Sequence, residues 1–231
     1  MRIYYVNKNT LYDNPEVGVY QDLMFHGEAL RHGAERPGAS YNLLEDDLRL
    51  PLWLVKNVYD VSPIFCPGID LIVSQEVREE LERFEFIVFL EVKYEKLFDV
   101  PYSKGVDYYH LLEPDYPETL FDAYDHDASL ADKIGRRFEM VVPRLSHVIG
   151  RYQDKVKISV RCPGCAVLKT EMSLSMLDEF PIVWESGFVM NDEAYSVIEG
   201  YIDRDYFDCY ELEVGDEQDE DGHRICMVTA I

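Results

Sequence analysis

The stretch "DLIVSQEVREELERF" (Asp70–Phe84) decides the fold. After Asp70, the residues Leu71, Ile72 and Val73 are apolar and branched, a composition typical of a buried strand. Ser74 follows at the position of a helix N-cap, and Glu76 falls in the first turn, where the helix dipole favours a carboxylate. The apolar residues after the cap repeat at i, i+4 and i+7, which is one face of a helix: Val77, Leu81 and Phe84. The stretch therefore predicts a strand that turns directly into an amphipathic helix.

A similar pattern occurs near the C-terminus, in "GFVMNDEAYSVIEGY" (Gly187–Tyr201). Asn191 takes the place of Ser74, and the apolar spacing is repeated by Ala194, Ile198 and Tyr201. The "LEV" of Leu212–Val214 then echoes the "LEV" of Leu90–Val92. We interpret this as a weak internal repeat of strand, cap, helix and strand. The alternative is that any capped amphipathic helix between two strands gives the same pattern.

The remaining chain predicts further strands around these two units. Arg2–Val6 is expected to form an edge or first strand, after which the chain is irregular to about Asn42, with Gly27–Asn42 mostly loop. Pro51–Val61 fits a buried strand or a short helix. We predict one α+β domain over 1–231, with a mixed or antiparallel sheet, few amphipathic helices and a duplicated strand-helix-strand unit. Its candidate halves are 1–100 and 144–231.

The charge of the chain restricts its partners. It has 45 acidic and 22 basic residues, a formal net charge of −23, and 17 tyrosines. Such a field repels nucleic acid and anionic membranes and attracts basic proteins, and tyrosine suits interfaces. The alternative is that the charge only keeps the protein soluble. No stretch approaches the roughly 20 apolar residues of a membrane helix.

Five cysteines and one short motif raise the question of a metal. The odd number of cysteines, with no secretory signal in view, predicts a reducing compartment and a cytoplasmic protein. Cys162 and Cys165 form a C-x2-C knuckle, and His223 and Cys226 offer the other two ligands of a Cys3His zinc site. The alternatives are buried core cysteines, an inert turn thiol, or a redox C-x-x-C pair.

Two acidic runs are candidate contact sites. The first, "DAYDHD", contains Asp122, Asp125, His126 and Asp127, and it could also hold a metal ion. The second is expected in a hairpin loop before the last strand and contains Asp216, Glu217, Asp219, Glu220 and Asp221. The alternative for both runs is a solvated charged loop.

The segment "LIVSQEVREEL" (Leu71–Leu81) resembles the signature of a group of bacterial immunity proteins, in which an apolar strand ending in "IVS" leads into a charged helix. These proteins neutralise the toxins of polymorphic toxin systems. Phe188–Ile198 matches the same signature more loosely. Some relatives carry a C-x-x-C-G knuckle, and the "CPGCA" of this chain lacks the final glycine. The resemblance implies a cytoplasmic α+β binding protein without an active site.

Charge and resemblance together predict an immunity protein that binds and neutralises a cognate, basic bacterial toxin. A toxin that attacks nucleic acid needs basic residues to hold its substrate, and an acidic inhibitor can compete for that site. We expect no catalytic residues, no direct binding of nucleic acid and no membrane contact. Two alternatives stay open, namely a metal-dependent hydrolase that uses the cluster at 122–127 and a zinc-stabilised adaptor.

Overall fold

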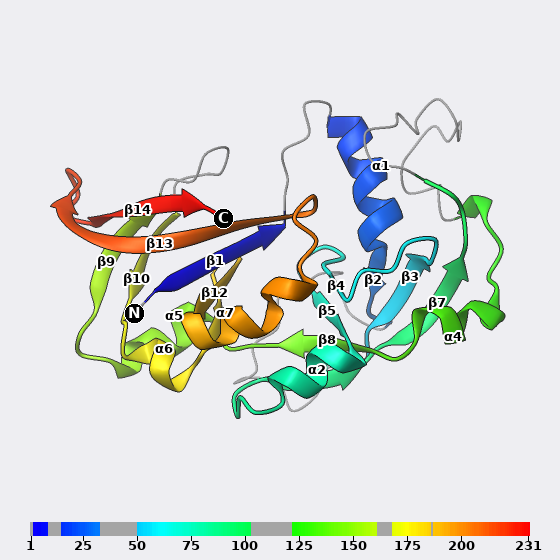
Figure 1. The fold of residues 1–231 in the computed structure, drawn as a ribbon, viewed down its shortest axis with the longest axis horizontal. Coiled ribbons are helices and arrows are strands. Elements are labelled where there is room, and N and C mark those ends of the chain that lie inside the picture. The colour runs from blue at the N-terminus through cyan, green and yellow to red at the C-terminus, as the bar shows by residue number, and fades with distance from the viewer. Residues whose placement is uncertain (1, 9–14, 33–49, 103–121, 161–167, 186) are drawn as a thin grey trace.

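The computed structural model describes residues 2–8, 15–32, 50–102, 122–160, 168–185 and 187–231. It has an α+β fold, as the sequence predicts. Figure 1 shows an elongated molecule with a seven-stranded sheet at one end, a three-stranded sheet at the other and a four-stranded sheet between them. The strand orders are β10-β9-β14-β13-β1-β12-β11, β2-β3-β7 and β4-β5-β8-β6.

The strands and helices alternate irregularly along the chain. The strands are β1 (Ile3–Lys8), β2 (Glu28–Leu30), β3 (Trp53–Asn57), β4 (Ile64–Phe65), β5 (Leu71–Ser74), β6 (Val88–Glu91), β7 (Lys93–Phe98), β8 (Arg137–Val141), β9 (Val156–Val160), β10 (Leu168–Met172), β11 (Ile182–Trp184), β12 (Phe188–Asn191), β13 (Phe207–Gln218) and β14 (Arg224–Ala230). The α-helices are α1 (Pro15–His26), α2 (Gln75–Leu81), α4 (Ala131–Ile134), α5 (Leu145–Val148), α6 (Met176–Glu179) and α7 (Asp192–Ile198). Short 3-10 turns are η2 (Ala128–Leu130), η3 (Ile149–Arg151) and η4 (Glu199–Tyr201).

Strand β1 lies inside the seven-stranded sheet, between β13 and β12, and is buried on both faces. Tyr4 and Val6 pack into one hydrophobic core, which also covers the four-stranded sheet and helices α2 and α7. Ile3 and Tyr5 point to the opposite face and pack with α5 and α6. This alternation is the two-residue period of a strand. The first strand is therefore present as predicted, but it lies in the interior of its sheet and not at an edge.

Both predicted N-caps are confirmed. The Ser74 hydroxyl accepts a hydrogen bond from the backbone N–H of Val77 at 3.3 Å, and α2 begins at the next residue. The Asn191 side-chain oxygen accepts from the N–H of Ala194 at 2.9 Å, and α7 begins in the same way. The predicted apolar face of α2 is buried, because Val77 and Leu81 are fully enclosed.

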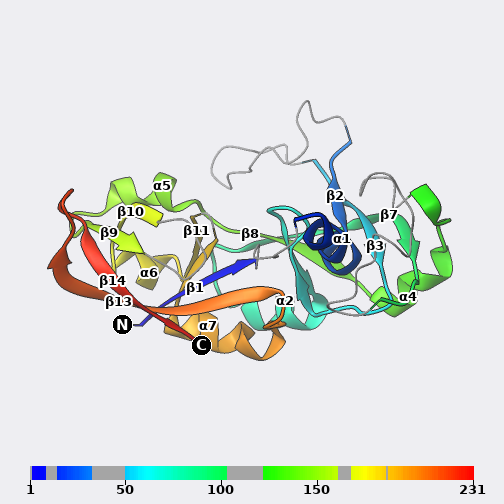
Figure 2. The same ribbon diagram turned by 90° about the horizontal axis from the view of Figure 1, so that it is seen from above.

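The two strand-helix units have the same topology, which the view from above in Figure 2 helps to follow. Strand β5 and strand β6 run parallel, α2 connects them, and β8 lies antiparallel between them. Strands β12 and β13 are likewise parallel, connected through α7, with β1 antiparallel between them. The strand before each unit, β4 or β11, forms an antiparallel pair with β5 or β12. Each unit is thus a split β-α-β arrangement with one additional strand.

The inserted strands are exchanged between the two units. Strand β1 precedes the first unit in the chain but lies in the sheet of the second, whereas β8 precedes the second unit but lies in the sheet of the first. The candidate halves 1–100 and 144–231 therefore do not correspond to separate structural units. The first half contains a strand of the other half's sheet, and β8 lies outside both ranges.

The registers of the two units agree residue by residue. Each cap residue lies opposite the first residue of the inserted strand, because Ser74 pairs with Arg137 and Asn191 pairs with Ile3. The backbone N–H of each cap residue also donates to a proline carbonyl in the preceding segment, that of Pro63 at 2.8 Å or Pro181 at 3.0 Å.

Side-chain contacts follow the same correspondence. Arg2 lies 3.6 Å from Glu211, and the equivalent Arg136 lies 2.8 Å from Glu91. Both pairs join the residue before the inserted strand to the neighbouring strand. The correspondence matches Val92 with Leu212, since these lie opposite Arg137 and Ile3. The predicted alignment of the two "LEV" triplets is therefore wrong by two residues.

Two elements lie where the sequence predicts irregular chain. Helix α1 (Pro15–His26) follows the first strand, and β2 (Glu28–Leu30) falls inside the predicted loop at 27–42. Met24 and Phe25 of α1 are fully buried. The packing of these side chains stabilises a helix whose apolar residues do not form a clear stripe in the sequence.

Candidate functional site

The structure describes two of the four predicted zinc ligands, His223 and Cys226. Cys162 and Cys165 lie outside the described residues, so the Cys3His site stays a prediction. Cys226 is buried in β14, and burial raises the pKa of its thiol to about 11. His223 is half-buried and immediately precedes the same strand. In the described part of the chain, Cys226 thus has the surroundings of a core cysteine.

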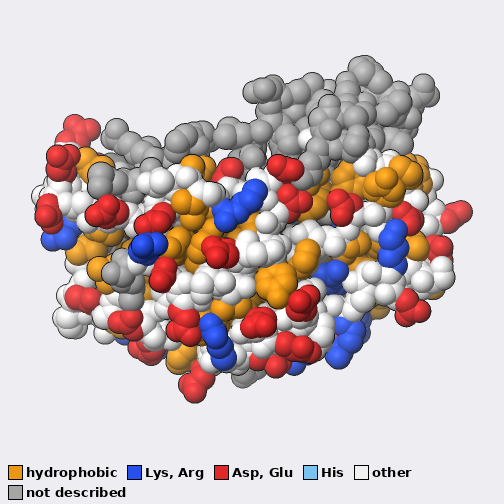
Figure 3. Space-filling model, viewed as in Figure 1, with side chains coloured by type: hydrophobic (Ala, Val, Ile, Leu, Met, Phe, Trp, Pro, Cys, Tyr) orange, Lys and Arg blue, Asp and Glu red, His pale blue; other side chains and the backbone are white. Residues whose placement is uncertain are grey.

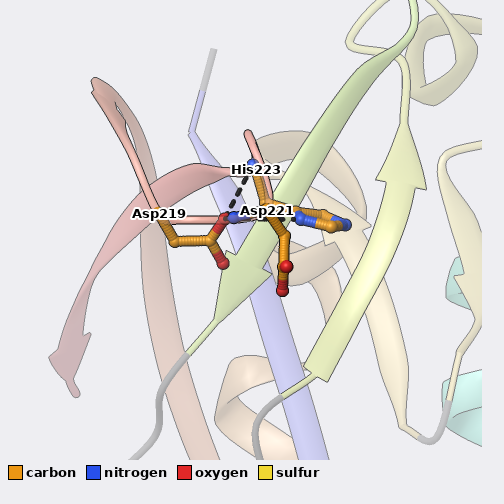
Figure 4. A group of neighbouring side chains, drawn as sticks. All are labelled: Asp219, Asp221 and His223. Atoms are coloured by element: carbon orange, nitrogen blue, oxygen red, sulfur yellow. Dashed lines mark hydrogen bonds and ion pairs between the residues drawn. The ribbon is translucent and has the colours of Figure 1, made fainter.

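The tip of the β13–β14 hairpin brings together a histidine and two carboxylates. Potential ligand atoms of Asp219, Asp221 and His223 lie within 4.8 Å of one another. Figure 4 shows the hydrogen bonds that explain this grouping, because the Asp219 Oδ1 atom accepts from the backbone N–H groups of Asp221 at 3.0 Å and His223 at 2.9 Å. Asp219 therefore stabilises the turn of the hairpin. The sequence correctly predicts this hairpin, although β13 extends further than expected, to Gln218.

The charged side chains of the run at 122–127 are exposed, and two of them accept hydrogen bonds from backbone N–H groups. The Asp127 Oδ1 atom accepts hydrogen bonds from the hydroxyl and the N–H of Ser129, which lower the pKa of the Asp127 carboxyl. The His126 Nδ1 atom accepts from the backbone N–H of Leu97 at 3.0 Å. Asp122 and Asp125 are exposed. Among the described residues, the group with metal-ligand spacing lies at 219–223 and not here. This geometry gives no support to a hydrolase centre at 122–127.

A buried ionic group that the sequence does not predict joins three distant segments. One terminal nitrogen of Arg31 donates to Asp70 Oδ1 at 2.9 Å and to Glu139 Oε1 at 2.6 Å. The other terminal nitrogen donates to the carbonyl of Leu50 at 2.7 Å. The three side chains are 2%, 7% and 1% exposed. The carboxylates hold the pKa of Arg31 above its ordinary value against the opposing effect of burial. These contacts identify a structural ion group.

A second buried group surrounds Lys56, whose side chain is fully enclosed between aromatic rings. Its Nζ atom donates to the carbonyl of Phe25, and burial lowers the pKa of Lys56 to about 7. The neighbouring His26 accepts from the backbone N–H of Cys66 at 2.8 Å, and burial holds the pKa of His26 well below its ordinary value. Burial also raises the pKa of the Cys66 thiol to about 12, which makes it a poor nucleophile.

A broad acidic surface lies on α2, α6, α7 and the residues that follow these helices. Figure 3 shows acidic side chains along the lower side of the view, where these helices lie in Figure 1. Ten exposed carboxylates stand against two arginines, Arg78 and Arg83, a net charge of −8. We call this surface the acidic helix face, and its carboxylates are Glu76, Glu79, Glu80, Glu82, Glu85, Asp178, Glu179, Asp192, Glu193 and Glu199.

The acidic helix face lies between the two predicted contact sites. The hairpin with Asp216–Asp221 and the segment Asp122–Asp127 lie at opposite ends of the molecule (Figures 1 and 2). They cannot belong to one compact patch. The acidic helix face unites segments that are more than a hundred residues apart in the chain, from Glu76 to Glu199. The charged segment at 75–85 is visible in the sequence, but its neighbours on this face depend on the fold.

Comparisons with protein-family models, curated proteins and solved structures give no match. None of the helices in the described part of the chain is both long and apolar enough to cross a membrane.

Proposed function

We propose that this chain is an immunity protein that binds a basic protein toxin in the cytoplasm and neutralises it. The observation that carries the proposal concerns the segment Leu71–Leu81, which resembles immunity proteins. It forms β5 and α2, and α2 contributes the largest share of the acidic helix face.

The physical argument starts from the charge of the expected partner. A toxin that acts on nucleic acid holds its substrate with lysine and arginine side chains. An acidic inhibitor is attracted to the same residues over distances of about 8–10 Å at moderate ionic strength. It therefore associates rapidly and covers the substrate site. The acidic helix face supplies such a field from a folded surface.

Co-expression with the protein encoded by the adjacent gene tests the proposal. We expect cells that produce both proteins to survive and cells that produce the neighbour alone to die. The purified pair should bind, and the association rate should fall as salt is added. Equal death with and without this chain would exclude the immunity function. An association rate that does not depend on salt would preserve immunity but exclude the electrostatic mechanism.

A further inference from the structure

A groove with a volume of about 430 Å³ opens on the acidic helix face, where the end of α2 meets α6 and the start of α7. Phe84, Phe86 and Pro181 provide apolar lining. Phe86 is 39% exposed, and its ring centroid lies 4.5 Å from that of Phe180, which is buried. The exposed ring therefore rests on a side chain that belongs to the core, so its position is fixed before any partner arrives.

Four carboxylates and one cation surround these apolar residues. They are Glu85, Asp178, Glu179, Glu193 and Arg83, a net charge of −3. Arg83 lies 3.4 Å from Glu193, and both side chains are more than half exposed. An ion pair this exposed contributes on the order of 0–1 kcal/mol. A cation from a partner can therefore replace Arg83 beside Glu193 at little cost.

The stability of helix α2 does not explain the acidic residues at its end. The helix dipole favours cations near a C-terminus, yet Glu79, Glu80 and Glu82 occupy this end of α2. Glu82 forms a hydrogen bond with Arg78 at 2.7 Å, which offsets part of the unfavourable field. A basic partner would offset the remainder, so the charge distribution fits binding better than folding.

We propose that this groove receives an arginine side chain of the toxin. The guanidinium group stacks on Phe86 and forms ion pairs with Glu85, Asp178 and Glu193. An arginine fits because its planar cation both stacks on aromatic rings and pairs with carboxylates. Arginine and aromatic residues are also enriched among the residues that dominate binding energy at interfaces. This inference rests on the proposed immunity function, and it locates the contact on a surface outside both acidic runs named from the sequence.

The two acidic runs lack this combination of features. In each of them a carboxylate already accepts hydrogen bonds from nearby backbone N–H groups. These carboxylates are Asp219 in the hairpin turn and Asp127 before η2. The groove instead joins the exposed Phe86 ring with carboxylates from α6, from α7 and from the turn that follows α2. Apolar contact and opposite charge at one place are what a tightly held interface residue requires.

The experiment compares two double charge reversals that change the net charge equally. The groove variant carries Glu85→Lys and Asp178→Lys, and the control carries Asp216→Lys and Glu220→Lys in the exposed hairpin. Thermal unfolding checks that both variants fold. Binding to the neighbouring gene's protein is then followed by association and dissociation rates. Both variants should lose some association rate, because both weaken the long-range field.

The dissociation rate separates the two surfaces. We expect it to rise at least tenfold for the groove variant and to stay within about twofold for the hairpin variant, since close charge pairs act mainly on dissociation. The single variant Phe86→Ala should also dissociate faster. Unchanged dissociation of both groove variants would overturn the groove proposal while leaving the immunity function intact.

A small probe tests the groove independently of the toxin. N-acetyl-arginine amide, titrated into the 15N-labelled protein, should shift the amide resonances of residues 83–86 and 178–179 and leave those of 216–221 nearly unchanged. Shifts of equal size at both places would overturn the groove proposal. If the wild-type chain does not bind its neighbour, the immunity function fails, and this titration alone decides the groove.

Discussion

Replacing Arg31 with methionine should lower the free energy of unfolding by about 3–5 kcal/mol at neutral pH. The guanidinium group is 2% exposed and lies 2.9 Å from an oxygen of Asp70 and 2.6 Å from an oxygen of Glu139. Methionine fills much of the same volume but supplies no charge or donor. Two carboxylates that are 7% and 1% exposed would then lose their contacts with this guanidinium group while still buried in the core. The cost arises mainly from these buried charges and not from the arginine itself.

A double variant distinguishes this mechanism from a simple packing defect. The variant with both Arg31→Met and Glu139→Gln removes one of the two buried charges together with their cation. We expect it to recover part of the loss of stability at pH 7.

Urea unfolding at pH 7 measures these differences, provided that the transitions are two-state. The exposed Arg83→Met variant is the matched control and should change stability by no more than about 0.5 kcal/mol. A loss below about 1 kcal/mol for Arg31→Met would refute the reasoning. So would a double variant that is no more stable than Arg31→Met alone.

Three further predictions concern other residues. Lys56→Met should stabilise the protein most at or below pH 7, because the folded pKa of Lys56, about 7, lies below the unfolded value of 10.5. The gain in stability should fall as the pH rises towards 10.5. Urea unfolding measures it, with Lys155→Met at an exposed site as the control. Ser74→Ala should cost about 1 kcal/mol in the same assay, and Asn191→Ala more, since the Asn191 amide also donates to the carbonyl of Leu177 at 2.9 Å. If Cys162, Cys165, His223 and Cys226 bind zinc, protein purified without chelator should contain one equivalent by elemental analysis, and zinc-free protein would remove that prediction.

Local patterns predicted the two capped helices because the cap is a local interaction. Ser74 and Asn191 each bond to an N–H three residues later, so the necessary information lies within a few positions of the chain. The hairpin turn at Asp219 was predictable for the same reason. Helix α1, which the sequence does not predict, shows the opposite case. It depends on the burial of Met24 and Phe25 against distant strands and carries a weak local signal.

Pairing between distant segments could not be derived from one sequence. Strand β1 is buried on both faces, and so is β8, which takes the equivalent place in the other sheet. The local sequence of β1 therefore does not decide which of the two sheets it joins. The ion group of Arg31, Asp70 and Glu139 spans 108 positions between its outer members, and no spacing rule connects them. The acidic helix face was missed for a related reason. Runs of charge are visible in a sequence, but surface charge density depends on which helices the fold places side by side.

The exchange of β1 and β8 links folding to the proposed binding. Helix α2 contacts β5 and β8, helix α7 contacts β12 and β1, and the two helices contact each other. Each helix therefore rests partly on a strand that precedes the other unit in the chain. The groove takes residues from the turn after α2, from α6 and from the start of α7, so it exists only when the exchanged arrangement is complete. A partner held in the groove contacts both units at once and binds the folded chain in preference to the unfolded one. By mass action, such a partner must raise the stability of the whole exchanged structure and not only that of the helices it contacts.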